Sequence, residues 1–314
     1  MRAYIVKRIL MLIPVLFAVS VLIFFLVRVL PGDVISGILG IEQTPENRAV
    51  LEKQFNFDKP VPQQYLIWIT NILKGDFGIS LRTSRPIMPD FVQCFKVTFQ
   101  LTIIASIIAW IIAIPLGIMS SLKRNSSMDF FIRIFGLLGV SVPNFAFATL
   151  LILFLALTFN YFPPLMWVGF FTNPVKNMEG VFWPALVLGA IMAGSVMRMT
   201  RSSMLEVLRH DFIKTVRAKG AGPRLVIFKH AFKNSMIPVI TLIGMQMGAL
   251  LGGTVVIEQI FSLPGVGQMT LEAIFTRDYP VVQANILMLA AIYVLINLLV
   301  DITYAVIDPR IKLK

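Results

Sequence analysis

Long apolar stretches with little or no charge are the feature of this sequence that most limits its fold. A helix needs about 20 consecutive apolar residues to cross the hydrocarbon core of a bilayer. The chain is 57% hydrophobic and 14% charged, with a mean hydropathy of +0.82, whereas soluble domains average about 25% charged residues. We therefore expect an all-α, polytopic membrane helix bundle with about six transmembrane helices. The predicted spans are residues 9–30, 97–122, 130–159, 181–197, 236–256 and 281–304. The first exceeds the about 7–15 residues of a signal-peptide core, so we expect it to stay uncleaved.

Basic residues are concentrated in alternate connections between these spans. Residues 198–233 carry nine Lys or Arg against only Glu206 and Asp211, and both ends of the chain are basic. The segments without a comparable excess are 31–96, 160–180 and 257–280. Cytoplasmic loops are enriched in Lys and Arg, so both termini and residues 198–233 are predicted to be cytoplasmic. The net charge of +12 is then explained by orientation, and no nucleic-acid partner is expected.

The long segment after the first span, residues 31–96, is predicted to be external and to contain helices. Thr44-Pro45-Glu46 has the pattern of a helix start, because proline suits the first helical position. Residues 62–73 place Tyr65 and Trp68 with other apolar side chains on one helical face. This second helix is expected to pack on the spans or to lie on the outer membrane surface.

Two spans carry small residues at every fourth position. One series is Ala185, Gly189 and Ala193, and the other is Gly244, Gly248 and Gly252. This spacing puts the small residues on one helical face, where two backbones can approach closely. Packing within the chain and packing against a partner subunit are both consistent with the pattern.

No motif for catalysis or for binding a metal or cofactor is found in the sequence. The GxxxxGK[ST] pattern is absent, so the chain is not expected to bind ATP through a P-loop. Asp76-Phe77-Gly78 spells the metal-binding triplet of kinases, but the other kinase motifs are missing. The single cysteine, Cys94, and the two histidines, His210 and His230, do not form a zinc pattern. We therefore assign no catalytic, cofactor-binding or metal residue, and we do not expect an enzyme.

Ionisable side chains are scarce in the predicted spans, where Arg28, Arg133 and Asp301 lie near the ends. Carriers driven by ions usually place such groups at mid-membrane. The scarcity favours a pore whose energy comes from another protein. A self-powered secondary carrier or channel, and a scaffold without a substrate, are the alternatives from other classes.

A short helix is predicted within the basic segment. Asp211 is expected to cap its start and Gly220 to end it in the left-handed conformation, with Arg217 near the last turn complementing the dipole. Phe212, Ile213 and Val216 would supply its apolar contacts. The basic segment either only fixes orientation or also provides a docking helix for a cytoplasmic partner.

Residues 214–221, Lys-Thr-Val-Arg-Ala-Lys-Gly-Ala, resemble the cytoplasmic "EAA" loop of ABC importer permeases, most closely in the oligopeptide/dipeptide/nickel group. Lys214-Thr215-Val216 replaces the Glu-Ala-Ala of the general motif. The similarity covers essentially the whole chain, and its amino-terminal part is similar to the first permease subunit of that group. Further matching segments are Leu30–Asp33, Gly75–Gly78, Ser141–Phe145, His230–Asn234, Gly252–Glu258, Phe261–Gly267, Arg277–Pro280 and Asp308–Arg310.

The resemblance implies a permease subunit of an ATP-driven importer for di- or oligopeptides, with nickel or another small solute as the alternative cargo. The implied partners are a second homologous permease subunit, two cytoplasmic ABC ATPases, an external solute-binding protein and the lipid bilayer. The implied location is the inner or plasma membrane of a prokaryote.

The resemblance also implies roles for particular residues and a division of the chain. The helix that docks the ATPase would comprise Asp211, Lys214, Thr215, Arg217, Ala218, Lys219 and Gly220. Gly244, Gly248 and Gly252 would serve helix packing or line the path. Glu258, Pro264, Gly265 and Gly267 would form an external loop near the binding protein. Residues 1–96 would form the first span with its external segment, and residues 97–314 the permease core with the coupling loop 198–233.

Overall fold

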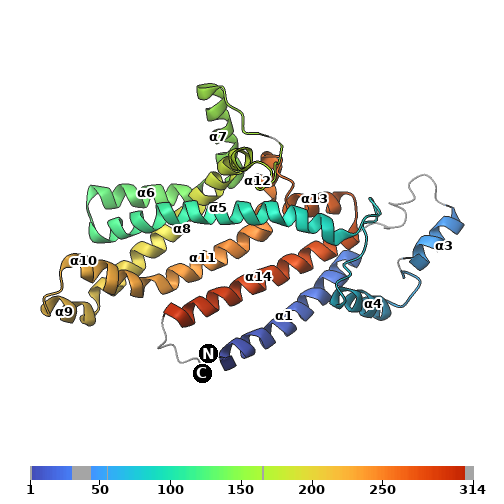
Figure 1. Cartoon of the computed structure of the whole chain (residues 1–314), viewed down its shortest axis with the longest axis horizontal. Helices are drawn as coiled ribbons and strands as arrows, with labels where there is room; N and C mark the ends of the chain where they lie inside the picture. The colour runs from blue at the N-terminus through green and yellow to red at the C-terminus, as the bar shows by residue number, and fades with distance from the viewer. Residues whose placement is uncertain (1, 30–43, 55, 165, 308–314) are drawn as a thin grey trace. The chain divides into compact units, whose positions relative to one another are not determined.

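The computed structural model describes residues 2–29, 44–54, 56–164 and 166–307. Within these ranges the regular structure is helical, and the only β interaction is an isolated bridge between Ile79 and Pro86. This confirms the all-α prediction (Figure 1). The elements are α1 (Arg2–Val29), α3 (Pro45–Gln54), α4 (Val61–Leu73), α5 (Ile87–Leu122), α6 (Ser127–Ser141), α7 (Asn144–Phe159), α8 (Pro174–Arg209), α9 (Asp211–Ala218), α10 (Pro223–Leu225), the π-helix η1 (Val226–Phe232), α11 (Lys233–Gly253), α12 (Val255–Ile260), α13 (Val266–Phe275) and α14 (Tyr279–Ile307).

The described helices include five that are long and apolar enough to cross a membrane, and a bent pair that could form a sixth span. The five candidates are Leu10–Arg28, Ile87–Leu122, Pro174–Arg209, Pro223–Gly252 and Tyr279–Thr303. The expectation of about six spans is confirmed. Several helices extend well beyond their apolar stretches. The fourth predicted span, residues 181–197, is only the middle of the 36-residue helix α8.

The third predicted span, residues 130–159, is not one helix. It consists of α6 and α7, which meet at an angle of 105°. Pro143 is the reason, because proline has no N–H to donate and disfavours helical conformation in the residue before it. Val142 is accordingly extended (φ −86°, ψ 124°), and Pro143 precedes the first residue of α7. The other prolines at Pro14, Pro115, Pro184 and Pro238 do lie inside helices, as expected.

The chain divides into two compact units, Met1–Val97 with Pro264–Leu295, and Thr98–Leu263 with Ile296–Lys314. In the first unit, the core includes buried residues of α1, α5, α13 and α14. Helix α4 confirms the predicted amphipathic helix and packs on α1. The Tyr65 ring lies 5.2 Å from the Phe24 ring, edge to face, and its hydroxyl lies 2.8 Å from the Ser20 Oγ.

In the second unit, α8 packs closely against neighbouring helices through its small residues. Ala185, Gly189 and Ala193 are all buried, so this series serves packing within the chain. A Cβ atom added at Gly189 would lie 2.7 Å from the carbonyl oxygen of Ala105 and 2.9 Å from the Ile108 Cβ. The glycine therefore permits the close approach of α8 to α5.

Replacing Gly189 by Ala is expected to lower the free energy of unfolding by about 1–3 kcal/mol, because the added methyl group meets backbone that must shift. The matched control is Gly252→Ala in α11, where an added Cβ has no atom within 4 Å among the described residues. The control should be neutral or slightly stabilising, since alanine favours helix over glycine by about 1 kcal/mol. Thermal unfolding of both purified variants in detergent measures the difference, and equal melting temperatures would contradict it.

Candidate functional site

The basic segment, residues 198–233, is mostly helical rather than a loop. It contains the last turns of α8, then α9, α10 and η1. The predicted short helix is present as α9, which follows α8 after a single extended residue, His210 (φ −63°, ψ 146°). His210 is the N-cap residue and makes no side-chain cap bond, so the expectation that Asp211 caps the helix is wrong. Asp211 instead begins the helix, and Lys214 donates to its carboxylate at 2.8 Å on the exposed surface.

The end of α9 has the predicted left-handed glycine. Gly220 has φ +82°, a conformation that costs glycine little and other residues more. The Gly220 amide donates to the Arg217 carbonyl at 2.9 Å, and the Lys219 amide donates to the Thr215 carbonyl at 3.1 Å. The chain then turns into α10 at Pro223.

One face of α9 is fixed to the rest of the second unit. Ile213 is fully buried, and Val216 packs beside it. Their buried neighbours come from α5, α8 and η1: Ile118, Met204, Val207, Val226 and Ala231. Phe212 was predicted to supply an apolar contact together with Ile213 and Val216, but it lies outside this cluster. Its side chain is 41% exposed and stacks on the His210 ring.

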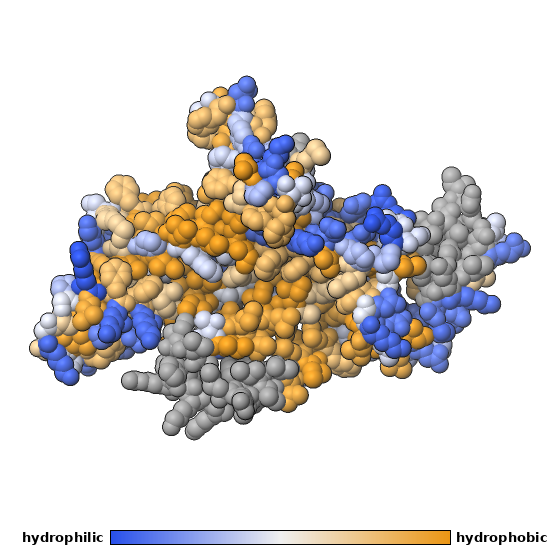
Figure 2. Space-filling model, viewed as in Figure 1, coloured by the Kyte–Doolittle hydropathy of each residue, from blue (hydrophilic) through white to orange (hydrophobic). Residues whose placement is uncertain are grey.

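The other face of α9 is exposed and basic. Lys214, Thr215, Arg217, Ala218 and Lys219 are all exposed. Figure 2 shows hydrophilic side chains gathered over α9 and α10, whereas hydrophobic ones cover α6. A cavity of about 370 Å³ lies beside the helix. Its lining residues are Ser121, Leu122, Leu208, Arg217, Ala221, Pro223, Val226 and Ile227. The exposed face of α9 is thus positively charged, with the cavity beside its C-terminal end.

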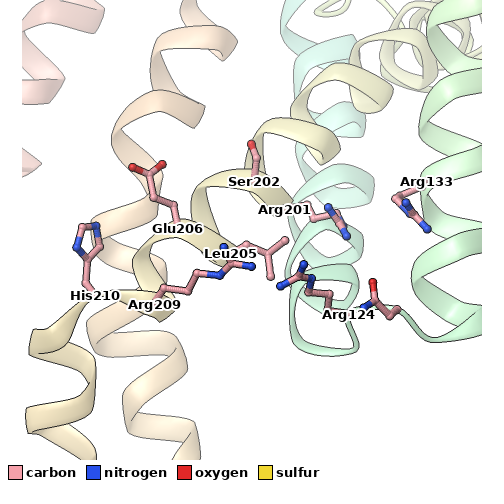
Figure 3. A pocket seen from close by; sticks show the side chains of 9 residues that line it. Arg124, Arg133, Arg201, Ser202, Leu205, Glu206, Arg209 and His210 are labelled. Atoms are coloured by element: carbon pink, nitrogen blue, oxygen red, sulfur yellow. The ribbon is translucent and has the colours of Figure 1, made fainter.

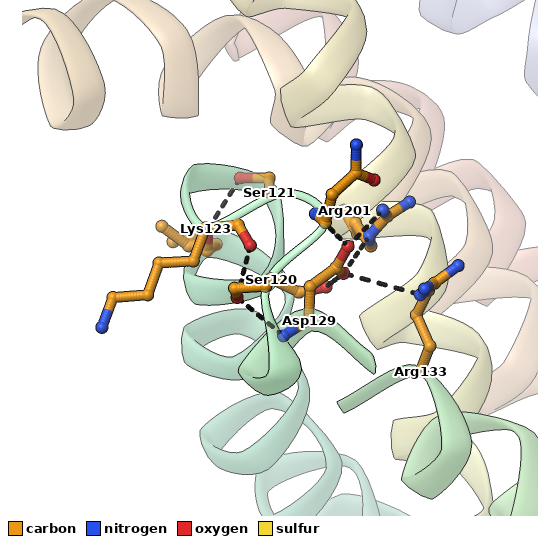
Figure 4. A network of polar contacts seen from close by, with 9 residues as sticks. Ser120, Ser121, Lys123, Asp129, Arg133 and Arg201 are labelled. Atoms are coloured by element: carbon orange, nitrogen blue, oxygen red, sulfur yellow. Dashed lines mark hydrogen bonds and ion pairs between the residues drawn. The ribbon is translucent and has the colours of Figure 1, made fainter. Parts of the chain in front are cut away.

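A buried carboxylate connects α5, α6 and α8 in the same unit. Asp129 is fully buried, and Arg201 donates to both of its oxygens at 2.8 and 2.9 Å. The Ser120 hydroxyl donates to it at 2.5 Å and the Asn125 amide at 3.0 Å, with the Arg133 guanidinium 3.7 Å away (Figure 4). Sequence reasoning missed this network. The sequence feature that could have indicated the network is Asp129 itself, an acidic residue near Lys123 and Arg124 in the connection between the second and third predicted spans.

The glycine series in α11 has no single environment. Gly244 is buried, and a Cβ added there would come within 2.1 Å of a Val300 methyl group, so it packs against α14 within the chain. Gly248 is also buried, whereas Gly252 is exposed with open space around it. Packing within the chain therefore explains why a small residue is needed at Gly244, but it does not explain the glycine at Gly252.

The predicted external loop is partly helical and partly buried. Glu258 lies in α12 rather than in a loop and is fully buried. Thr98 and Thr254 both donate to its Oε1 at 2.7 Å, which compensates for the burial. Pro264 is exposed, whereas Gly265 and Gly267 are buried at the start of α13. The described residues hold no group of three or more His, Cys, Asp and Glu that could bind a metal ion.

Comparison with known families identifies the chain. The family described as "Binding-protein-dependent transport system inner membrane component" matches residues 113–313, and the corresponding N-terminal family matches residues 1–102. The chain belongs to this family. It is thus a membrane permease of an ABC importer, which confirms the resemblance found in the sequence. Two of the segments that carried the resemblance, Leu30–Asp33 and Asp308–Arg310, lie outside the described residues, as do the basic residues Arg310, Lys312 and Lys314.

Relatives of the permease match along its full length. It is 41% identical to the dipeptide transport system permease protein DppB of Alkalihalophilus pseudofirmus, over 99% of this chain and 100% of the relative. It is 38% identical to DppB and to the glutathione transport system permease protein GsiC of Escherichia coli, over 100% of each chain. A chain from the inward-facing MetNI methionine ABC transporter matches 72% of the permease with a TM-score of 0.59 and 17% identity, and all of that chain is covered. This last similarity shows the fold alone.

Proposed function

We propose that the permease conducts di- or oligopeptides and that α9 docks an ATPase. The peptide cargo is supported by relatives that are 38–41% identical over the whole chain and are named for dipeptide and glutathione transport. Uptake into proteoliposomes that contain the full transporter tests the cargo. Labelled dipeptides should accumulate on addition of ATP, and accumulation of Ni²⁺ without peptide would overturn this part of the proposal.

The docking role is carried by one observation, which is that α9 is fixed on one face and exposed and basic on the other. Fully buried Ile213 holds the helix to α5, α8 and η1, so a force on α9 reaches these helices directly. Arg217 lies both on the exposed face and in the wall of the adjacent cavity. A carboxylate on a nucleotide-hydrolysing partner would pair with this guanidinium, and exposed Phe212 offers an apolar contact beside it.

The family and the distribution of charge support a particular assembly. Two ATPases would each grip one such helix, one on this chain and one on a second homologous permease, while an external binding protein delivers the cargo. Both termini would be cytoplasmic in the inner membrane of a prokaryote, because residues 198–233 have a large basic excess. Residues 1–96 would be the first span and its external segment, and residues 97–314 the permease core with the coupling loop 198–233. Pro264, Gly265 and Gly267 would then lie near the delivery side.

Reversing the charge of Arg217 is expected to uncouple transport while the chain still inserts. Arg217→Glu places a like charge against an acidic partner surface, and we expect ATP-driven uptake to fall at least tenfold, since each tenfold corresponds to about 1.4 kcal/mol of lost contact. The matched control is Lys123→Glu, an exposed charge reversal in the α5–α6 connection. Normal uptake and normal ATPase co-purification by Arg217→Glu would refute docking through this face.

A further inference from the structure

A second cavity in the same unit is lined by arginines and has no role in the proposed docking helix. It is a pocket of about 560 Å³, open to the surface, between the α5–α6 connection, α6 and the end of α8 (Figure 3). Its lining residues are Arg124, Asn125, Arg133, Arg201, Ser202, Leu205, Glu206, Arg209 and His210. Four guanidinium groups thus share one cavity with a single carboxylate in its lining.

The positive charge in this cavity is only partly neutralised. Arg201 is paired with the buried Asp129, and Arg133 lies farther from the same carboxylate, at 3.7 Å. In the part of the chain that the structure describes, neither Arg124 nor Arg209 forms an ion pair. Figure 3 shows these two side chains pointing toward one another from opposite sides of the cavity. Like charges repel at short range, so an anion placed between them would relieve the repulsion.

The donors in the cavity match a phosphate group. The planar fork of arginine binds phosphate oxygens through two parallel hydrogen bonds, with more geometric selectivity than lysine. Asn125 also lines the cavity, and an asparagine side chain has two N–H donors. The volume exceeds what a bare phosphate needs and leaves space for a group attached to it.

The surface beside the cavity indicates where that phosphate comes from. Phe130 and Leu137 are 54% and 57% exposed, and they lie three residues before and four residues after Arg133 on α6. Such spacing places them on the same side of the helix as Arg133. An apolar surface next to a basic cavity at the end of membrane helices suits a lipid, with acyl chains on the helix and the head group in the cavity.

We propose that this arginine cavity binds the phosphodiester of an anionic phospholipid. Arg124 and Arg209 hold the phosphate, and the exposed face of α6 around Phe130 and Leu137 accommodates the acyl chains. The lipid thereby connects α6 to the end of α8, directly before α9.

Native mass spectrometry of the full transporter in detergent, titrated with phosphatidylglycerol, tests the proposal. The wild-type chain should retain one phosphatidylglycerol in preference to phosphatidylcholine. Arg124→Gln/Arg209→Gln should bind it roughly thirtyfold more weakly, since each surface arginine contributes about 1 kcal/mol to binding of anionic lipid. The matched control is Arg224→Gln/Lys229→Gln, which removes two exposed charges from the basic segment 198–233 without altering the cavity lining. The control should bind as the wild type does.

Three results would overturn the proposal. Equal losses in the two double variants would mean that net charge alone attracts the lipid. Inorganic phosphate that displaces phosphatidylglycerol at equal concentration would identify a free anion as the occupant. Retention of the lipid by the permease alone, but not by the complex with its ATPases, would assign the cavity to an acidic partner surface. The cavity variant and its control both leave α9 unaltered, so these outcomes do not affect the docking proposal.

Discussion

Replacing Asp129 by Asn is expected to lower the free energy of unfolding by about 3–5 kcal/mol, the cost typical of removing one partner of a buried ion pair. Asparagine has nearly the same volume, so the change isolates the charge. Arg201 would lose a bidentate partner at 2.8 and 2.9 Å. Its own side chain is only 20% exposed, so water replaces the lost contacts poorly. The Ser120 and Asn125 donors would also face an amide that accepts less well than a carboxylate.

Unfolding of the purified variants in detergent, followed by temperature, measures this effect. The matched control is Arg133→Gln, which removes the more exposed partner at 3.7 Å. Exposed ion pairs contribute about 0–1 kcal/mol, so this control should melt close to the wild type. If Asp129→Asn melts with the control rather than far below it, the network does not hold α5, α6 and α8 together.

Replacing Ile213 by Asp is expected to detach α9 and abolish ATP-driven uptake. Ile213 is fully buried among apolar side chains from α5, α8 and η1. A carboxylate there has no partner and would cost several kcal/mol to bury, more than this eight-residue helix gains by docking. We therefore expect the helix to leave its site while the spans still insert.

Co-purification of the ATPase subunits and peptide uptake are the measurements. Ile213→Val is the control, because losing one buried methyl group costs about 0.5–1.5 kcal/mol and keeps the contact apolar. The control should retain both properties. An Ile213→Asp chain that still binds its ATPases and transports peptide would show that α9 need not be fixed to the bundle.

The spans were predictable from the sequence because the thickness of the bilayer sets how many consecutive apolar residues a crossing helix needs. The break at Pro143 was not predicted, because five prolines lie within apolar stretches and four of them remain inside helices. Whether a proline bends a helix depends on how neighbouring helices satisfy the freed carbonyl groups. The sequence of one helix does not contain that information.

The site was predicted in part for a similar reason. The left-handed Gly220 and the burial of Ile213 follow from local sequence rules, and both are present in the structure. The Asp129 network joins residues 72 positions apart, and the Glu258 network joins residues 160 positions apart. Such pairs form only after the helices pack. Asp129 is unusual as an acidic residue beside the basic α5–α6 connection, but hydropathy and local propensity do not say which residue it pairs with.

Site-specific cross-linking from α9 tests the proposed docking most directly. Cys94 is the single cysteine, so a Cys94→Ala background carrying Lys214→Cys places one thiol on the exposed face of the helix. We predict a cross-link to the ATPase subunit in the assembled, transport-competent complex, and none from Lys123→Cys in the same background. A complex that imports peptide on ATP hydrolysis, yet forms no ATPase cross-link from Lys214→Cys, Thr215→Cys or Ala218→Cys, would contradict docking through α9.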